Sequence, residues 1–384
     1  MTKVAITGVG HTEVGKHRDR TLEELFVDAS RKAIGDAGVD SIDGLYVGNM
    51  LSIFSRNQGH LAPYLADKIG FPGVHAVSTE SACASGGVAL AQGVMAVKSG
   101  LLDDVLVGGV EKMSGMETPD ATWGLTFAED LEHVRRTGVS FAGLNAMLAR
   151  LYMKTHGLRH EDIARFSVQC HDNGLTADHA QLKKKITVED ALSSPVVADP
   201  LRLFDACPIS DGAAVVVLQA DSDGTDGSVE IVASSVATQT MSLHERKDML
   251  SFKASQLAAG RAQAQAGIGL EEIDFVEVHD AFNVTGLLSL ESMGFFSPGK
   301  STYAVQKGET SLDGRLPVNT FGGLKARGHP VGATGLYQTC EAVLQLRGEA
   351  GSNQIMRSAV YGLLQNVGAV DSTSAVNILR GPGT

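Results

Sequence analysis

Three short segments of the chain hold residues that could together transfer an acyl group. The first, residues 78–87, joins a predicted strand to an apolar helix and contains Cys83. A thiol at this point faces unpaired N–H groups and the positive end of the helix dipole, which favour the thiolate, and the same N–H groups could hold an oxyanion. Most cysteines are only small buried hydrophobes. The strand, sharp turn and small-residue helix favour a nucleophile here.

Two histidines follow in the second half of the chain. His279 comes directly after the predicted strand 274–278, and His329 lies in a glycine-rich loop, 319–335. A lone histidine at a strand end is more often structural, whereas the glycines predict a backbone that approaches something closely. A phosphate loop is the competing interpretation, but GxxxxGK[ST] is absent and the N-terminal Gly-Val-Gly lacks a third glycine. With Cys83, the histidines make a Cys–His–His set suited to acyl transfer.

The elements that must position these residues alternate between short β-branched runs and longer helical stretches, which is typical of α/β layering. Residues 86–98 are small or apolar on every face and stop before Gly100, so they predict a buried helix. The second half repeats the order of the first. The matching pairs are 229–234 with 3–9, 274–278 with 44–48, 332–346 with the buried helix, and 358–364 with 104–110. A repeat of this length predicts a duplicated α/β domain.

The predicted domains follow from this repeat. Residues 1–118 and 191–221 form the N-terminal half, and residues 222–384 form the C-terminal half. Between them, 119–190 is an inserted, polar and helical stretch that contains Lys183, Lys184 and Lys185. Because the surrounding charge is acidic, we interpret it as a solvated insertion rather than a nucleic-acid-binding segment.

Composition narrows the functional classes. The 384 residues suffice for about two to three domains, and 32 basic against 44 acidic residues, a net charge of −12, oppose a nucleic-acid partner. No apolar run approaches the ~18 residues of a membrane span, and no secretory leader is evident, so we expect a cytoplasmic protein without a membrane partner. Four cysteines without a CxxC pair indicate neither a disulfide framework nor a zinc site. Three of them are assigned to packing: Cys170, Cys207 and Cys340.

Several motifs in the same order resemble the thiolase superfamily over nearly the whole chain, nearest to its sterol-carrier-type and archaeal acetyl-CoA acetyltransferases. They are 44–50 (GLYVGNM), 81–87 (SACASGG), 108–114 (GGVEKMS), 207–214 (CPISDGAA) and the loop 323–335. The resemblance implies two similar α/β halves stacked in five layers, α-β-α-β-α, with an inserted loop domain. This fold agrees with the repeat.

The resemblance also implies a role for each site residue. Cys83 would carry the acyl group as a thioester, His329 would deprotonate it, and His279 would polarise the thioester oxygen of the acyl-CoA that becomes the enolate. The N–H groups of Cys83 and Gly368 would form a second oxyanion site. CoA would lie across the inserted region as substrate, with no permanently bound cofactor and no metal. The substrate-binding loop would include Asn319, Gly322, Gly323 and Gly328.

One departure from the family pattern concerns the second acid/base, usually a cysteine at one of two places. This chain has Asn366 at the first and Ala281 at the second, so neither supplies a thiol, and Gln365 and Ala369 replace the His and Gly that flank the first. Loss of a positioned general base typically costs ~10²- to 10⁴-fold in rate. Decarboxylative ketoacyl synthases of the same superfamily use Cys–His–His without that second cysteine.

Three hypotheses remain open. The leading one is an acyltransferase that forms a Cys83 thioester from acetyl-CoA or another short acyl-CoA, for Claisen condensation or thiolysis of a 3-ketoacyl-CoA. The others are a thiolase-like lyase that cleaves a β-hydroxyacyl-CoA by retro-aldol chemistry, and a CoA-binding protein with little turnover. The resemblance further implies a homodimer or tetramer, and a small zinc-ribbon/OB-fold partner protein.

Overall fold

The computed structural model describes residues 2–221 and 227–383. The predicted boundary after residue 221 adjoins residues 222–226, which lie outside the described part. Nine strands form one hydrogen-bonded sheet: β1 (Lys3–His11), β2 (Gly44–Gly48), β3 (His75–Thr79), β4 (Asp104–Glu111), β7 (Gly212–Asp221), β8 (Val229–Thr238), β9 (Phe275–Glu277), β10 (Tyr361–Gly368) and β11 (Thr373–Arg380). A separate small hairpin consists of β5 (Val196–Ala198) and β6 (Leu201–Arg202).

The helices fall into three groups. Those of the first half are α1 (Leu22–Ala37), α2 (Ser52–Arg56), α3 (Leu61–Ile69) and α4 (Ser85–Lys98). The middle of the chain contains α5 (Thr118–Leu125), α6 (Leu131–Thr137), α7 (Phe141–His156), α8 (His160–Gly174) and α9 (Val188–Ser193). The second half contains α10 (Lys253–Ala266), α11 (Asn283–Ser292), α12 (Ser301–Gln306), α13 (Gly323–Ala326) and α14 (Thr334–Arg347). None of the helices in the described residues is long and apolar enough to cross a bilayer.

The strand order confirms the internal repeat. The sheet runs β3-β2-β4-β7-β1-β8-β11-β10-β9, so β2-β4-β7-β1 in the first half corresponds to β9-β10-β11-β8 in the second. The two halves join through a short pairing of Ala5 and Ile6 with Glu230 and Val229. A single bridge between Val276 and Val318 stands where β3 pairs with β2 in the first half.

This correspondence explains how distant residues meet. In the first half the chain passes from β3 through Cys83 into α4. In the second half it passes from Val318 through the loop that contains His329 into α14. The two loops therefore occupy equivalent places at the ends of equivalent strands, one in each half.

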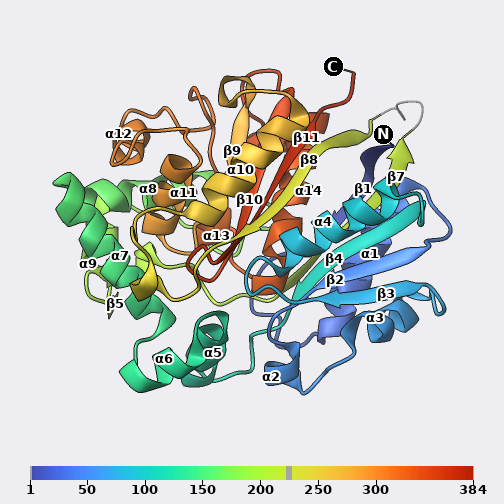
Figure 1. The fold of residues 1–384 in the computed structure, drawn as a ribbon, viewed down its shortest axis with the longest axis horizontal. Helices are drawn as coiled ribbons and strands as arrows, with labels where there is room; N and C mark the ends of the chain where they lie inside the picture. Colours follow the sequence, from blue (N-terminus) through green and yellow to red (C-terminus); the bar gives the residue numbers. More distant parts are fainter. Residues whose placement is uncertain (1, 222–226, 384) are drawn as a thin grey trace.

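The five-layer arrangement is also confirmed (Figure 1). Helices α4 and α14 pack on each other between the two halves of the sheet, and each contacts strands of both halves. Helices α1 and α3 cover the outer face of the first half, and α10 covers the outer face of the second. Because α4 and α14 have protein on nearly every side, an apolar helix without a polar face is what this layer requires.

Glycines allow α4 to enter this crowded layer. A Cβ on Gly86 would lie 2.8 Å from the carbonyl oxygen of Gly332, and one on Gly93 would lie 2.5 Å from a methyl of Val107. The helix ends as predicted before Gly100, which has a left-handed φ of 71°. Its last turn is less enclosed than predicted, since Met95 is 62% exposed.

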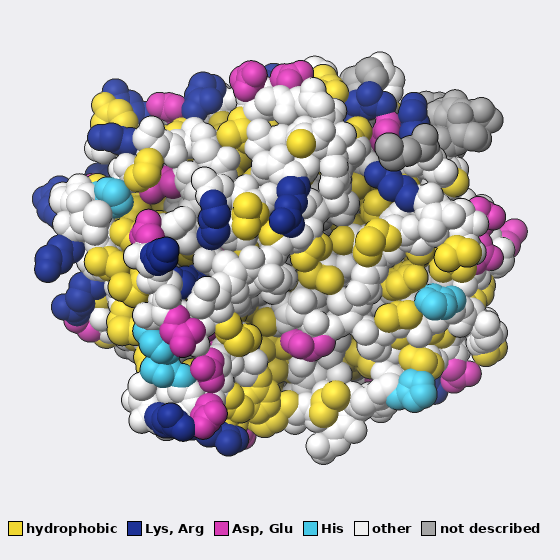
Figure 2. Space-filling model, viewed as in Figure 1, with side chains coloured by type: hydrophobic (Ala, Val, Ile, Leu, Met, Phe, Trp, Pro, Cys, Tyr) yellow, Lys and Arg dark blue, Asp and Glu magenta, His cyan; other side chains and the backbone are white. Residues whose placement is uncertain are grey.

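The inserted stretch differs from the prediction of a solvated segment. Lys183, Lys184 and Lys185 are exposed, but α7 and α8 place Tyr152 and Phe166 in the main core cluster beside α11. The prediction was wrong for these helices because their apolar faces close over the second half. On the face drawn in Figure 2, acidic and basic side chains are scattered among apolar ones.

Candidate active site

Cys83 lies in a tight turn between β3 and α4. Ala82 holds a left-handed φ of 51°, unusual for a residue with a side chain, and α4 begins at Ser85. The N–H groups of Ala84 and Ser85 donate to the carbonyls of Ser81 and Ala82. Donors that would otherwise be free at the helix start are thereby used within the turn.

The acidity of this thiol differs from the prediction. Burial raises the pKa of Cys83 well above its usual value, and charges on Cys207 and Glu111 raise it further. The N–H groups of Ala369 and of Cys83 itself act in the opposite direction, but more weakly. The prediction that the turn favours a thiolate is therefore wrong for the resting protein, because burial outweighs the few N–H groups left to face the sulfur. A base must take the proton during the reaction.

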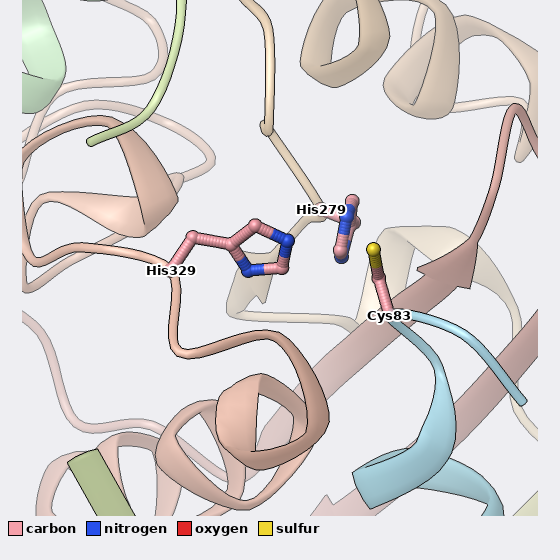
Figure 3. A group of neighbouring side chains, drawn as sticks. All are labelled: Cys83, His279 and His329. Atoms are coloured by element: carbon pink, nitrogen blue, oxygen red, sulfur yellow. The ribbon is translucent and has the colours of Figure 1, made fainter. Parts of the chain in front are cut away.

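The structure brings Cys83, His279 and His329 together (Figure 3). One ligand-type atom from each lies within 4.8 Å of the other two. The imidazole rings stand edge to face, with centroids 5.0 Å apart and planes at 86°. The three side chains come from the two halves of the repeat and are buried, at 2%, 2% and 5% exposure. A thiol, a base and a hydrogen-bond donor thus share one enclosed space.

Asn366 sets the tautomer of His279. Its Nδ2 lies 3.0 Å from the Cys83 carbonyl oxygen, and its Oδ1 lies 3.0 Å from the N–H of Gly87, so backbone partners define the amide orientation. The same Nδ2 donates to Nδ1 of His279 at 3.2 Å. Nδ1 therefore accepts, and the ring proton of the neutral histidine is on Nε2. Burial and the charge of Arg327 lower the pKa of His279 to about 3, which keeps the ring neutral.

His329 has the opposite tautomer to His279. Its Nδ1 lies 2.6 Å from the hydroxyl of Thr334, which in turn donates to the carbonyl of Pro330 at 3.3 Å. Nδ1–H is then the donor, and Nε2 carries a lone pair. Among the described residues this buried Nε2 has no hydrogen-bond partner. Burial, His279 and Arg327 together lower the pKa of His329 well below its usual value, so His329 is a neutral base.

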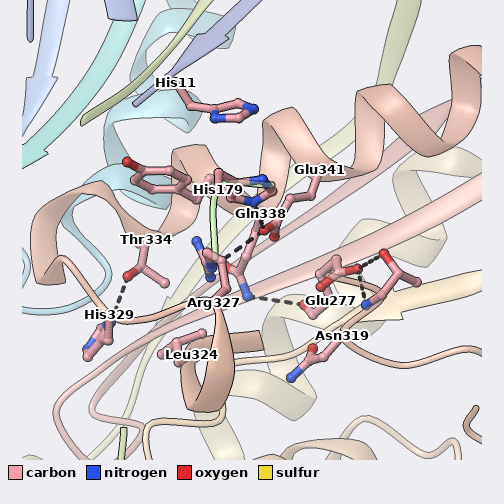
Figure 4. Close-up of polar contacts among 12 residues, drawn as sticks. His11, His179, Glu277, Asn319, Leu324, Arg327, His329, Thr334, Gln338 and Glu341 are labelled. Atoms are coloured by element: carbon pink, nitrogen blue, oxygen red, sulfur yellow. Dashed lines mark hydrogen bonds and ion pairs between the residues drawn. The ribbon is translucent and has the colours of Figure 1, made fainter. Parts of the chain in front are cut away.

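A buried charged cluster lies behind His329 (Figure 4). Arg327 is fully buried; its Nε lies 3.5 Å from Glu341, and its guanidinium is 5.2 Å from the centre of the Tyr337 ring. The same Glu341 oxygen is 2.8 Å from Nε2 of His179. Sequence analysis missed this cluster, although an arginine two positions before His329 was a signal. The positive charge of Arg327 lowers the pKa of both His279 and His329.

Glu277, two residues before His279, is part of the same region. One oxygen of this buried carboxyl accepts hydrogen bonds from the N–H and the hydroxyl of Thr320, at 2.8 and 2.6 Å. Burial and the neighbouring Glu341 raise the pKa of Glu277 to about 8. The strand end that carries His279 is therefore tied to the loop that carries His329.

The residues of the predicted substrate-binding loop pack closely against other parts of the protein. Asn319 is fully buried and accepts the N–H of Val278 at 2.8 Å. Positive φ angles occur at Gly322, Gly323 and Gly328, and a Cβ on Gly323 would lie 2.7 Å from the carboxylate of Asp280. The glycines therefore allow the loop backbone to take up this position. Their contact with substrate stays a prediction.

The remaining predicted positions also lie beside the site. Ala281 is buried, and Gly368 ends β10 with its Cα packed against the carbonyl of Ser81, where a Cβ would lie 2.5 Å from the oxygen. The next residue, Ala369, supplies the N–H that reaches the Cys83 sulfur and has a left-handed φ of 56°. Sequence analysis singled out Ala369 only as a family difference.

The side chains of Cys83, His279 and His329 are also of the types that bind metal ions. Thiol and imidazole are the ligand types that zinc prefers. Within the described residues, Cys83, His279 and His329 are the group of three such side chains close enough to hold a metal ion. The sequence prediction assigns no metal, and the reaction derived below uses none.

Comparison with known families agrees with this geometry. Residues 4–222 match the family "Thiolase, N-terminal domain", and residues 235–381 match "Thiolase C-terminal domain-like". The chain belongs to the thiolase family. The predicted resemblance is thereby confirmed, and the two matches correspond to the two halves of the thiolase fold.

Individual relatives extend this result. The chain is 43% identical to an acetyl-CoA acetyltransferase of Methanothermobacter thermautotrophicus, over 98% of this chain and 99% of that one. It is 39% identical to an acetyl-CoA acetyltransferase of Methanocaldococcus jannaschii, with 99% of each covered. The solved structure of a protein named "Ltp2-ChsH2(DUF35) aldolase" superposes with a TM-score of 0.83 at 25% identity, covering 99% of this chain and 98% of that one.

Proposed function

We propose that the protein is a thiolase-type acyltransferase that forms a thioester on Cys83 from acetyl-CoA or another short acyl-CoA. The observation that carries the proposal is the buried cluster of Cys83, His279 and His329, in which one ligand-type atom of each lies within 4.8 Å of the other two and the neutral His329 has an unpartnered Nε2. Relatives named acetyl-CoA acetyltransferase, similar over the full chain, support the same activity.

The first half-reaction follows from the protonation states. His329 Nε2 takes the Cys83 proton as the sulfur attacks the thioester carbonyl, so a thiol with a raised pKa becomes nucleophilic only when substrate is in place. The N–H groups of Cys83 and Gly368, together with that of Ala369 next to the Cys83 sulfur, stabilise the oxygen of the tetrahedral intermediate. His329 then returns the proton to the leaving CoA sulfur.

The second half-reaction forms or breaks the carbon–carbon bond. His279 Nε2–H donates to the thioester oxygen of the acyl-CoA that becomes the enolate, because Asn366 holds its other nitrogen as an acceptor. A neutral donor of this kind polarises the oxygen without giving up its proton. The products are a 3-ketoacyl-CoA in the condensation direction, or two acyl-CoA molecules in thiolysis.

Mass spectrometry after incubation with acetyl-CoA tests the proposal. We expect one acetyl group, mapped to Cys83, on the wild-type protein and on a Cys340→Ala control, whose lost thiol lies in a core cluster away from the site. Cys83→Ala should carry none. A wild-type protein that gains no acetyl group under conditions that acylate a known thiolase would contradict the proposal.

A second candidate, a retro-aldol lyase acting on a β-hydroxyacyl-CoA, is favoured by one observation: one of the solved structures that superpose on this chain is of a protein named as an aldolase. Retro-aldol cleavage needs the His279 donor for the enolate but no thioester on Cys83. Cys83→Ala therefore separates the two candidates. An acyltransferase loses essentially all turnover, whereas a lyase retains most of its cleavage of a β-hydroxyacyl-CoA.

The proposal extends to location and partners. We expect a cytoplasmic homodimer or tetramer, with CoA bound across the inserted domain of residues 119–190. This inserted segment supports the His329 loop, because the N–H groups of Gln181 and Leu182 donate to the carbonyls of Arg327 and Ala326. The matched aldolase includes a DUF35 component in its name, which supports a small partner protein. Sedimentation of the purified chain as a monomer at micromolar concentration would argue against the oligomer.

A further inference from the structure

The proposed reaction needs one more proton carrier than the three residues described above supply. When the carbon–carbon bond breaks in thiolysis, the α-carbon of the departing enolate must gain a proton, and condensation removes the same proton. His329 serves the Cys83 sulfur, and His279 keeps its proton to bind the enolate oxygen. Neither Ala281 nor Asn366 bears an acidic group. The inference that follows rests on the proposed function and concerns the identity of this carrier.

The segment 206–211 runs between the two histidine loops. Ala206 forms a bridge with Phe282, and the N–H of Cys207 donates to the carbonyl of Ala281 at 2.9 Å. Three residues on, the hydroxyl of Ser210 accepts the N–H of His329 at 2.9 Å, and Ile209 forms a bridge with the same histidine. Cys207 thus lies beside the loop of His279 and just before the contact with His329.

The environment of Cys207 differs from that of the other cysteines. Cys83, Cys170 and Cys340 are buried, whereas Cys207 is partly exposed. A charge on Cys207 is, after burial, the largest cause that raises the pKa of Cys83, so the two sulfurs lie in one electrostatic environment. The sequence alone assigns Cys207 to packing.

A buried cation accompanies this thiol. Lys325 is 1% exposed, and its Nζ has no hydrogen-bond partner among the described residues. Burial raises the pKa of Cys207 to about 12, and the Lys325 ammonium acts against that rise. His329, whose N–H is bound by Ser210 on the same segment as Cys207, also has an unpartnered Nε2. A buried polar atom without a partner calls for a ligand or substrate group, and Lys325 Nζ is such an atom within electrostatic reach of Cys207.

We propose that Cys207 is the second acid/base of the site and exchanges the proton of the substrate α-carbon, with Lys325 stabilising its thiolate. Cys207 thus supplies from a neighbouring segment the thiol that Ala281 lacks.

In thiolysis the protons balance as follows. His329 takes the Cys83 proton, and the Cys83 sulfur bonds to the 3-keto carbon of the substrate. The bond between C2 and C3 breaks, its electron pair forms the enolate, and the Cys207 S–H delivers its proton to C2, which releases acetyl-CoA. The Cys207 thiolate then regains a proton from the protonated His329, so that both groups are neutral when free CoA enters. Free CoA attacks the Cys83 thioester as His329 takes its proton, and the Cys83 sulfur leaves and receives that proton from His329.

The experiment separates the two half-reactions in Cys207→Ala and Cys340→Ala. Acetylation of Cys83 by acetyl-CoA is followed by mass spectrometry, and thiolysis is followed by consumption of acetoacetyl-CoA in the presence of CoA. Exchange of acetyl-CoA methyl protons in D2O is read by NMR. We expect Cys207→Ala to acetylate Cys83 at a rate near that of the wild type, but to lose thiolysis and exchange by ~10²- to 10⁴-fold. Cys340→Ala should retain all three.

A second variant moves the thiol back across the hydrogen bond that joins residues 207 and 281. Cys207→Ala combined with Ala281→Cys should recover thiolysis and exchange by at least tenfold over Cys207→Ala alone. A merely structural Cys207 would give no such recovery. Recovery from a residue on a different segment would show that the thiol, rather than the packing at position 207, carries the function.

Two results would overturn the inference. The first is thiolysis by an acetylating Cys207→Ala within twofold of the wild type. The second is loss of Cys83 acetylation together with thiolysis, without recovery in the double variant, because Cys207 would then act on Cys83 or on folding. Failure of the proposed function looks different: the wild-type protein itself would gain no acetyl group on Cys83.

Discussion

The substitution Asn366→Asp exchanges an amide for a carboxylate of almost the same shape at the residue that orients His279. The carboxylate can still accept the N–H of Gly87, now 3.0 Å from Oδ1. It cannot donate to the Cys83 carbonyl or to Nδ1 of His279, which lie 3.0 and 3.2 Å from Nδ2. Facing an acceptor, the neutral ring moves its proton to Nδ1, and Nε2 loses the proton that would polarise the thioester oxygen.

The magnitude follows from that lost donor. Removal of one hydrogen-bond donor to a developing oxyanion costs ~10²- to 10³-fold in kcat, or about 2.7 to 4 kcal/mol. We therefore expect thiolysis of acetoacetyl-CoA by Asn366→Asp to fall by that factor at a pH high enough to ionise the buried aspartate. Acetylation of Cys83 should fall much less, since His329 and its contact with Thr334 are unchanged.

A double-mutant cycle with His279→Ala isolates the tautomer effect. In the His279→Ala background no imidazole remains to be reoriented, so Asn366→Asp should have little further effect on thiolysis. Circular dichroism and thermal unfolding of each variant check that the fold persists. The reasoning is refuted if Asn366→Asp acts within threefold of the wild type, or if its full effect persists without the histidine.

Three further outcomes are expected. Thr334→Val leaves Nδ1 of His329 without its 2.6 Å partner, so Cys83 acetylation in a quenched-flow assay should slow by roughly 5- to 150-fold, equivalent to ~1 to 3 kcal/mol for an unsatisfied buried donor. Arg327→Met removes the cation that lowers the pKa of His279 and His329, so the acidic limb of the rate–pH profile should move to higher pH. Loss of the buried ion pair with Glu341, which keeps His179 as a partner, should cost up to ~3 kcal/mol in unfolding free energy. Burial raises the pKa of Glu111 from 4.5 to about 7. The protonated carboxyl therefore contributes its full stabilisation below pH 4.5, and this stabilisation is lost as the pH rises through 7. Between these pH values the free energy of unfolding in urea should fall by ~3 kcal/mol less in Glu111→Gln than in the wild type.

Much of the architecture was predictable because it depends on local pattern. The strands that the sequence pairs across the repeat, 3–9 with 229–234, 44–48 with 274–278 and 104–110 with 358–364, occupy corresponding places in the sheet. Helix α4 begins one residue before its predicted start and ends at its predicted last residue, Lys98. The insertion was predicted less well. Its helices are polar enough to suggest solvation, yet α7 and α8 bury an apolar face whose partner, α11, lies far along the chain.

The family, the duplicated α/β plan and the choice of Cys83, His279 and His329 as candidate site residues could be inferred from the sequence alone, because each rests on a contiguous motif and on the order of motifs. Strand ends and turns bring such residues to one edge of a sheet whatever the details of packing.

The chemical state of those residues depends on their surroundings in the folded protein. The Cys83 thiol is protonated at rest because burial outweighs the few N–H groups left to its sulfur, and His279 has its proton on Nε2 because Asn366 lies against it. Asn366 reaches the Cys83 carbonyl from 283 positions away, and Cys207 meets the loop of Ala281 from another segment. Protonation depends on local dielectric and on which donors are already used. Both are properties of packing between segments that no single stretch of sequence contains.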